Sequence, residues 1–235
     1  MNFLNEDKSK LVKNVFNKVY DKYDLMNDIM SLGTHRIWKK NLISWVNPNK
    51  GSKILDVASG TGDIAKLCSK FTNNNCEITC VEPNEKMLLE GEKKLKNLNN
   101  LKWVLASAEK LPFKDETFDY YIISFGIRNV TNFNKSLSEA YRVLKNGGRF
   151  YCLEFSKVEN EILKKIYKNY SKLIPTIGKF VAGNEMPYNY LVQSINKFYN
   201  QEELLEKLLK KGFINVKYRN LTNGIAAIHT GWKIE

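Results

Sequence analysis

Metal-ligand and membrane-spanning patterns are scarce in this chain. Its 235 residues include two histidines and four cysteines, and no two cysteines are spaced as C-x-x-C. The usual zinc-binding patterns are therefore missing, so we expect no metal site and expect free thiols, as in a reducing compartment. No apolar run approaches the ~20 residues that a membrane-spanning helix needs.

The first residues also lack a targeting pattern. Residues 1–7 are acidic, contain no arginine and have no hydrophobic signal core. This composition argues against secretion and against a transit peptide. We therefore expect a cytoplasmic protein.

Basic residues are abundant, but they are dispersed. The chain has 37 lysines and arginines against 25 acidic residues, a net charge of +12 that would suit a nucleic-acid partner. However, no block of five or more basic residues occurs, and lysines recur through nearly every expected helix. A solvated lysine-rich surface is therefore favoured over a polyanion site, and an anionic membrane surface would benefit from the same charge.

Length and composition indicate one globular domain. Hydrophobic residues make up 43% of the chain and charged residues 26%, which is ordinary for a soluble fold. A chain of this length can bury one good α/β core but not two comfortably.

A strand, a small-residue loop and a helix follow one another at Ile54–Leu67. The apolar run Ile54–Val57 leads into Ala58–Gly62, and helix-like spacing begins at Ile64. Glycines at 60 and 62 let a ligand approach the backbone. The loop matches neither the P-loop nor the G-x-G-x-x-G pattern, which argues against phosphate as the ligand; the alternative is an ordinary turn.

An acidic residue at the end of the next strand favours a nucleoside ligand. The strand Glu77–Val81 is followed by Glu82, about 20 residues after the glycines, where a carboxylate meets ribose hydroxyls in doubly wound folds. Asp56 and Glu82 would then flank the nucleoside from two adjacent strands.

The strand-helix alternation continues beyond Glu82. We expect a third strand at Trp103–Leu105, whose polar exit is placed to hold an adenine or simply ends the strand. A fourth strand, Tyr120–Ser124, opens into the loop Phe125–Asn129 at the same edge of the sheet. Asn146–Gly148 is expected to cap the next helix, before a fifth strand at Arg149–Phe155.

Both ends of the chain add further elements. Apolar spacing within Leu11–Met30 predicts a helix followed by a capping segment, and a helix at Ile162–Leu173 has an apolar stripe beside lysines. That stripe either packs on the domain or meets anionic lipid. Prolines and glycines at 175–187 predict an irregular, lid-like segment, and a helix at Gln201–Lys211 precedes a closing hairpin turned at Asn223–Gly224.

Several motifs along the chain are typical of one protein family. They lie at Lys22–Asp28, Leu55–Asp63, Leu111–Phe113, Ile123–Thr131, Arg142–Arg149 and Leu153–Lys157. Together they resemble the ubiquinone/menaquinone biosynthesis C-methyltransferases, which use S-adenosylmethionine (SAM). The similarity extends almost end to end. The segments at 22–28 and 123–131 are more specific than the glycine loop, which alone indicates only a methyltransferase.

The resemblance implies an α/β, Rossmann-like class I methyltransferase fold. It implies a mostly parallel seven-stranded sheet in the order 3-2-1-4-5-7-6. Residues 1–50 would form an N-terminal helical cap and residues 51–235 the SAM-dependent domain, with a helical insertion at about 158–200.

The resemblance also implies the residues that contact SAM. The cofactor-binding residues carried over are Gly60, Thr61, Glu82, Ser107, Ala108 and Ser124. Three positions depart from the family pattern, because Ser59 stands for the more usual Gly, Glu82 for the more usual Asp and Ser107 for the more usual Asn.

Catalysis would need a stabiliser for a phenolate and a route for protons. SAM already carries a good leaving group, and an ionised quinol hydroxyl makes the ortho ring carbon nucleophilic. Arg128 and Asn129 are the candidates for holding the ring oxygen, although a structural ion pair is an equal alternative for Arg128. The resemblance adds Tyr23 and Asp24 to the proton relay.

The predicted function is SAM-dependent C-methylation of a demethylated prenyl quinol. The ring is 2-polyprenyl-6-methoxy-1,4-benzoquinol, demethylmenaquinol or both. Two alternatives stay open: a SAM-dependent RNA methyltransferase, and a non-catalytic SAM-binding assembly protein of quinone synthesis. Nucleic acid is not favoured as a partner. A peripheral site at the inner face of the cytoplasmic membrane, other quinone-biosynthesis enzymes and a homodimer stay open as well.

Overall fold

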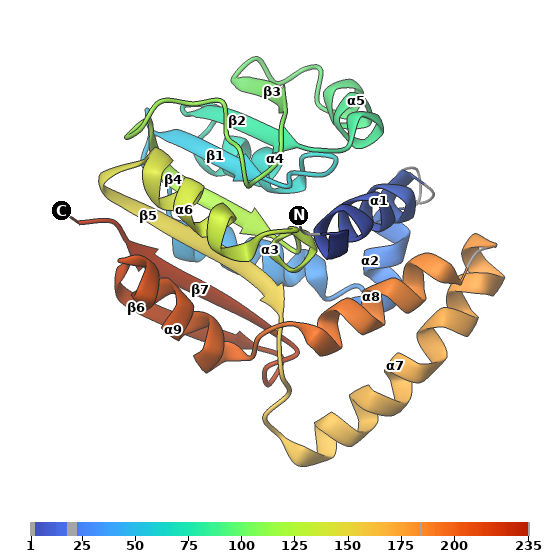
Figure 1. Cartoon of the computed structure of the whole chain (residues 1–235). Helices are drawn as coiled ribbons and strands as arrows, with labels where there is room; N and C mark the ends of the chain where they lie inside the picture. Colours follow the sequence, from blue (N-terminus) through green and yellow to red (C-terminus); the bar gives the residue numbers. More distant parts are fainter. Residues whose placement is uncertain (1–2, 18–22, 184, 235) are drawn as a thin grey trace.

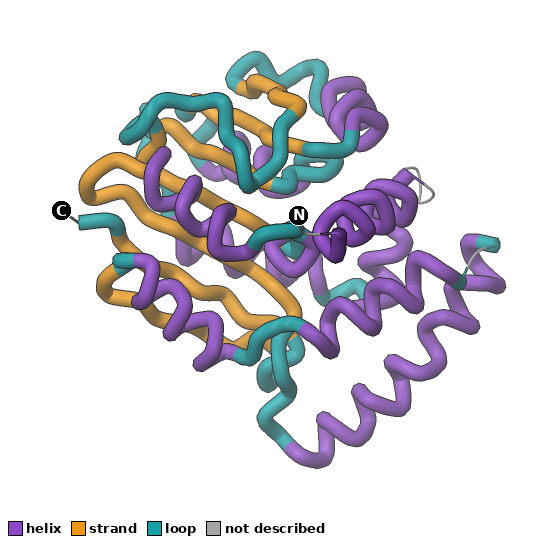
Figure 2. The backbone as a smooth tube through the Cα atoms, viewed as in Figure 1, coloured by secondary structure: helices purple, strands orange, loops and turns teal. Residues whose placement is uncertain are grey.

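A seven-stranded sheet forms the centre of the computed structural model, which describes residues 3–17, 23–183 and 185–234 (Figures 1 and 2). The order is β3-β2-β1-β4-β5-β7-β6. The strands are β1 (Lys53–Val57), β2 (Glu77–Glu82), β3 (Leu101–Leu105), β4 (Phe118–Ser124), β5 (Leu144–Phe155), β6 (Ile214–Leu221) and β7 (Ala226–Trp232). Neighbours from β3 to β5 are parallel, and β7 is antiparallel to β5 and β6. The predicted order is confirmed.

Helices cover both faces of the sheet. Before β1 and between the first strands lie α3 (His35–Val46), α4 (Asp63–Phe71) and α5 (Glu85–Lys94); α6 (Phe133–Val143) and α9 (Gln201–Lys211) come later in the chain. One buried cluster joins α3 and α4 to the sheet, and a second joins α6 and α9 to it. The strands between them are therefore buried from both sides, as the apolar runs of β1 and β4 require.

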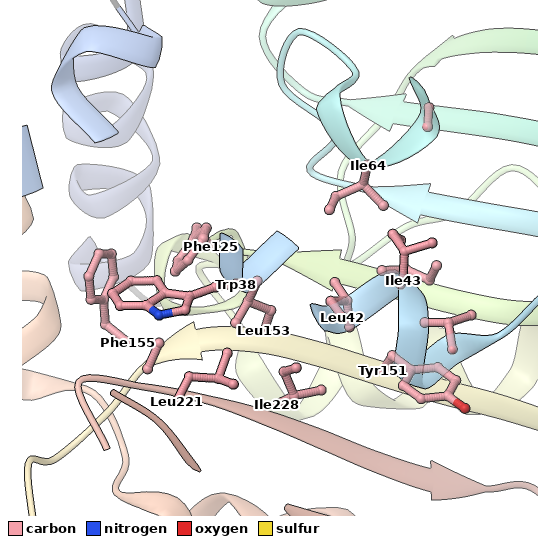
Figure 3. Close-up of a cluster of buried hydrophobic side chains, with 14 of the residues drawn as sticks. Trp38, Leu42, Ile43, Ile64, Phe125, Tyr151, Leu153, Phe155, Leu221 and Ile228 are labelled. Carbon is pink, nitrogen blue, oxygen red and sulfur yellow. The ribbon is translucent and has the colours of Figure 1, made fainter. Parts of the chain in front are cut away.

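The cluster under α3 is drawn in Figure 3. Trp38 and Leu42 of α3 point toward Leu153 and Phe155 of β5, and the rings of Trp38 and Phe155 meet edge to face at 6.0 Å. Leu42 is fully buried. The helix before the first strand is thus part of the core of the sheet domain.

Two N-terminal helices lie where one helix and a capping segment were expected. They are α1 (Phe3–Asn17) and α2 (Tyr23–Ser31), and residues 18–22 lie outside the described part of the chain. Within α1, Lys8 Nζ donates to the Val130 carbonyl at 2.6 Å; at its last residue, Asn17 Oδ1 accepts from Asn84 Nδ2 at 2.9 Å. Because Asn84 follows β2 and Val130 follows β4, α1 crosses the carboxyl ends of these strands.

The prediction of an irregular segment at 175–187 is wrong. Helix α7 (Glu161–Ala182) continues through Pro175, and α8 (Met186–Lys197) begins soon after it (Figure 1). The reason is packing: Gly178 leaves room for the buried ring of Tyr188 in α8, and a Cβ there would lie 2.2 Å from that ring. This contact outweighs the missing N–H of the proline.

The expected glycine cap after α6 is also wrong. Helix α6 ends at Val143 and β5 begins at Leu144. The Gly147 amide donates to the Lys233 carbonyl at 2.7 Å, and the Lys233 amide donates to the Gly148 carbonyl at 2.9 Å. Pairing with the C-terminal residues therefore extends β5 through the two glycines.

All four cysteines are buried free thiols, as predicted. Within the described ranges, no helix combines the length and the apolar character needed to cross a bilayer.

Candidate active site

The loop after β1 is shaped by its glycines. Gly62 begins α4 with φ of 86°, and a Cβ there would lie 2.6 Å from Leu95 and 3.0 Å from Trp103. Glycine is thus required for both its conformation and its close packing. The Gly60 amide donates to Glu82 Oε2 at 2.9 Å, so the loop is tied to the end of β2.

The segment after β4 lies directly against this loop. A Cβ at Gly126 would come within 2.5 Å of Ala58 Cβ, and Phe125 takes an unfavourable φ of 55°. The Phe125 amide donates to the Leu153 carbonyl at 2.8 Å. The two loops therefore approach each other at the edge of the sheet where the carboxyl ends of the parallel strands lie, with no room for a larger residue at 126.

Two adjoining cavities open at this edge. The larger, about 280 Å³, lies under α1 and includes Gly60, Glu82, Ser107 and Ala108 in its lining. The smaller, about 20 Å³, is lined by residues that include Thr61 and Ser124. Ala58 and Phe125 border both cavities. The structure thus brings the six predicted cofactor-binding residues around one continuous region.

Two buried carboxyls face these cavities. Burial raises the pKa of Glu82 to about 7, although the amides of Asn84 and Gly60 donate to it. Burial also raises the pKa of Asp56 to about 8, opposed by the Ala65 amide and the Lys39 charge. Both groups therefore titrate near neutral pH, and a ligand that donates hydrogen bonds to them favours their ionised forms.

Asp63, at the start of α4, behaves in the opposite way. Burial would raise its pKa, but Lys39 at 2.8 Å and Lys94 at 3.3 Å lower it to about 2. Lys39 is buried and lines the smaller cavity with Asp56 and Ser124. The smaller cavity has room for about one water molecule and is lined by groups of both charges.

Arg128 occupies a buried ion pair. Its Nη1 lies 2.6 Å from Glu154 Oε1 at the end of β5, and both side chains are 2% exposed. The same nitrogen donates to the Phe125 carbonyl at 2.7 Å. The ion-pair alternative thus describes the position of this guanidinium, while its Nε stays buried without a hydrogen-bond partner among the described residues.

Asn129 is the catalytic candidate that lines the larger cavity. It ends the 3-10 turn η2 (Ile127–Asn129), and its Oδ1 accepts a hydrogen bond from the Tyr190 hydroxyl of α8 at 3.0 Å. Tyr23 and Asp24 begin α2, but their side chains lie outside the described part of the structure. Arg128 and Asn129 are therefore adjacent in sequence but face different surroundings.

Sequence reasoning missed several neighbours of the site. It did not single out Lys39, Glu154 or Tyr190, nor the residues of α1 that cover the larger cavity, such as Val12. A signal existed only for Glu154, because an acidic residue ending β5 next to β4 is placed to meet a basic residue after β4. The others come from helices whose docking no local pattern specifies.

The residues of the two cavities fit SAM. The Ser124 hydroxyl is buried without a partner in the described structure and lines the smaller cavity. The Glu82 carboxylate can accept from ribose hydroxyls, and the glycine loop leaves the backbone open to a close ligand. Together they offer contacts at both ends of the cofactor.

Known proteins resemble this chain over nearly its full length. The model of the ubiE/COQ5 methyltransferase family matches residues 1–233. Ubiquinone/menaquinone biosynthesis C-methyltransferase UbiE of Rickettsia bellii is 52% identical over 97% of this chain and 94% of its own length. The protein of the same name from Brucella anthropi is 51% identical over 97% of this chain and 89% of its own length.

Solved structures share the fold. A SAM-dependent methyltransferase of Thermotoga maritima has a TM-score of 0.69 at 19% identity, over 94% of this chain and 99% of its own. Phosphoethanolamine N-methyltransferase 2 of Haemonchus contortus, in complex with S-adenosyl-L-methionine, has a TM-score of 0.65 at 16% identity, over 84% of this chain and 52% of its own.

These matches confirm the resemblance drawn from the motifs, and with it a SAM-dependent methyltransferase. The match extends over both the sheet domain and the helices before it. The chain belongs to the ubiE/COQ5 methyltransferase family.

Proposed function

We propose that this chain methylates a ring carbon of a demethylated prenyl quinol, either 2-polyprenyl-6-methoxy-1,4-benzoquinol or demethylmenaquinol. Membership of the ubiE/COQ5 family carries this proposal. It is supported by the position of Asn129, which lines the cavity that holds the predicted SAM contacts and hydrogen-bonds Tyr190. The family match gives no support to an RNA substrate or to a non-catalytic assembly role.

SAM supplies an activated methyl group when it is bound. The ring carbon would accept this methyl group in place of its proton, with the thioether of S-adenosylhomocysteine as the leaving group. The chain must align the ring, exclude water and stabilise the phenolate. The cover formed by α1 and the narrow junction at Gly126 favour the first two tasks.

We assign the orientation of the ring oxygen to Asn129. Its amide nitrogen lies near the Phe125 carbonyl, at 3.5 Å, and its Oδ1 is held by Tyr190. Arg128 would act through its charge and through its hold on the Phe125 carbonyl, since its Nη1 is engaged by Glu154. Tyr23 and Asp24 stay the proposed route for protons.

The direct test offers the purified protein SAM with each demethylated ring, benzoquinol or naphthoquinol, in reduced and in oxidised form. We expect a methylated product by mass spectrometry from reduced rings only, because only they form a phenolate. If no ring is methylated while calorimetry shows SAM binding, the proposal is wrong, and the RNA and assembly alternatives replace it.

Asn129→Ala should lower kcat about 100-fold, as loss of a stabilising hydrogen-bond donor does, and leave the Kd for SAM within about threefold. Steady-state methylation and calorimetry measure the two effects. Asn134→Ala, an exposed change in the next helix, is the control and should leave both unchanged. A kcat for Asn129→Ala close to wild type would refute its assigned role.

SAM affinity should fall as the pH is lowered through 7. The pKa of Glu82 is about 7 in the free protein, so below that pH the carboxyl is protonated and must lose its proton to accept from both ribose hydroxyls. Calorimetry from pH 8 to pH 5.5 should show a loss approaching about tenfold per pH unit at the acid end.

Two variants separate Glu82 from other groups. Glu82→Gln should bind SAM more weakly at pH 8, and its affinity should depend much less on pH. We assign any pH dependence that remains to Asp56, whose pKa is about 8. Glu77→Gln, at the exposed other end of β2, should keep the wild-type profile. An unchanged slope in Glu82→Gln would count against ribose binding by Glu82.

We also propose that α7 places the protein at an anionic membrane surface. Its exposed apolar side chains are Ile162, Ile166 and Leu173, with exposed fractions of 72%, 59% and 58%. Exposed lysines at 164, 165, 168 and 172 lie beside them on the helix. A basic amphipathic helix of this kind suits an anionic bilayer.

A homodimer and other quinone-biosynthesis enzymes stay predicted partners.

Sedimentation with phosphatidylglycerol vesicles tests this surface. The double variant Lys164→Glu and Lys168→Glu should bind the vesicles at least about tenfold more weakly, since each lysine near an anionic surface contributes about 1 kcal/mol of binding free energy. Lys70→Glu with Lys96→Glu changes the net charge equally on another part of the surface. Equal loss in both double variants would indicate a general charge effect and not a role for α7.

A further inference from the structure

A second large cavity lies on the other side of η2. It has a volume of about 390 Å³ and is enclosed by α1, η2, the start of α6 and α8. Val130 borders both this cavity and the one that holds the predicted SAM contacts. The two spaces are thus neighbours with a shared wall, although the first already offers the contacts that SAM needs.

The lining of the second cavity is largely apolar and aromatic. Leu11, Ile127 and Val130 contribute aliphatic groups, and Phe133, Phe198 and Tyr199 contribute rings. The rings of Phe133 and Tyr199 lie 4.9 Å apart, and those of Phe198 and Tyr199 lie 5.3 Å apart. A flexible hydrocarbon gains from burial on such a surface.

The polar groups of this cavity do not form an anion site. Lys8 Nζ is directed to the carbonyls of Val130 and Arg128, at 2.6 and 3.3 Å, and burial lowers its pKa. Arg128 is paired with Glu154. Lys197 is an exposed residue of the lining. The interior therefore offers apolar contact, and positive charge is found toward solvent.

The second cavity is next to the catalytic candidate Asn129. The Tyr190 hydroxyl donates to Asn129 Oδ1, and Tyr190 itself lines the second cavity. A quinol ring held at Asn129 would have the second cavity directly across η2. We propose that the second cavity binds the first isoprene units of the prenyl chain of the acceptor, and that Lys197 marks the exit of the chain.

Ser194 provides a way to block the cavity. It lies on α8 and lines the cavity, and its hydroxyl donates to the Leu191 carbonyl of its own helix at 2.9 Å. Ser194→Phe would fill the space without removing a contact to another element. Asn196→Phe is the matched control, because residue 196 is exposed on the same helix and does not line the cavity.

The first test needs no methylation. A farnesyl chain bearing a benzophenone, with no quinol ring, is photocrosslinked to the full chain, and the sites are mapped by mass spectrometry. We expect crosslinks at residues 127–133 and 190–199, which Ser194→Phe reduces about tenfold or more and Asn196→Phe preserves. Crosslinks elsewhere, or crosslinks that Ser194→Phe leaves unchanged, would overturn the assignment.

The second test rests on the proposed function and compares kcat/KM for quinols with one and with many isoprene units. Ser194→Phe should lower kcat/KM about tenfold for the long chain and leave the short chain and the Kd for SAM unchanged. An equal loss for both chains would contradict a chain-binding role. If wild type methylates neither quinol but the crosslinks appear as expected, the proposed function fails and the chain-binding cavity stands.

Discussion

The buried ion pair between Arg128 and Glu154 holds the geometry of the site. Either charge alone in this position would be strongly destabilising, because both side chains are almost fully removed from water. The pair joins the ends of β4 and β5 and also anchors the Phe125 carbonyl. Phe125 has a strained φ of 55°, which persists only where its surroundings hold it. The wall that separates the two large cavities therefore depends on this interaction.

At the carboxyl ends of the strands, burial raises the pKa of carboxyl groups and neighbouring lysines lower it. Asp56 and Glu82 end adjacent strands and are buried, so their pKa values rise toward neutrality. Asp63 lies one short loop further on, where Lys39 and Lys94 keep it ionised. A cationic ligand at this edge would offset part of the cost of charging the two strand-end carboxyls. Their raised pKa values thus follow from burial, and the lowered pKa of Asp63 follows from the two lysines beside it.

The sheet could be predicted because its signals are local. Apolar runs at β1 and β4, the glycine loop and the carboxylate at 82 each lie within a few residues, and the strand order came from the family resemblance. Predictions at Gly148 and Pro175 were wrong because distant partners, Lys233 and Tyr188, decide the local conformation. The cover formed by α1 was missed for the same reason, since it depends on how separate elements dock, whereas Glu154 could have been found from its place at the end of β5.

Helix α1 is attached across the cavity by hydrogen bonds to two loops. Lys8 bonds to the loop after β4, and Asn17, the last residue of the helix, bonds to the loop after β2. Val12 and Phe16 between them face the cavity. Thermodynamic linkage then applies in both directions: whatever free energy the helix adds to cofactor binding, the bound cofactor returns as stability of the docked helix. A cofactor bound at the proposed site would therefore stabilise the docked N-terminal helix as well as supply the methyl group.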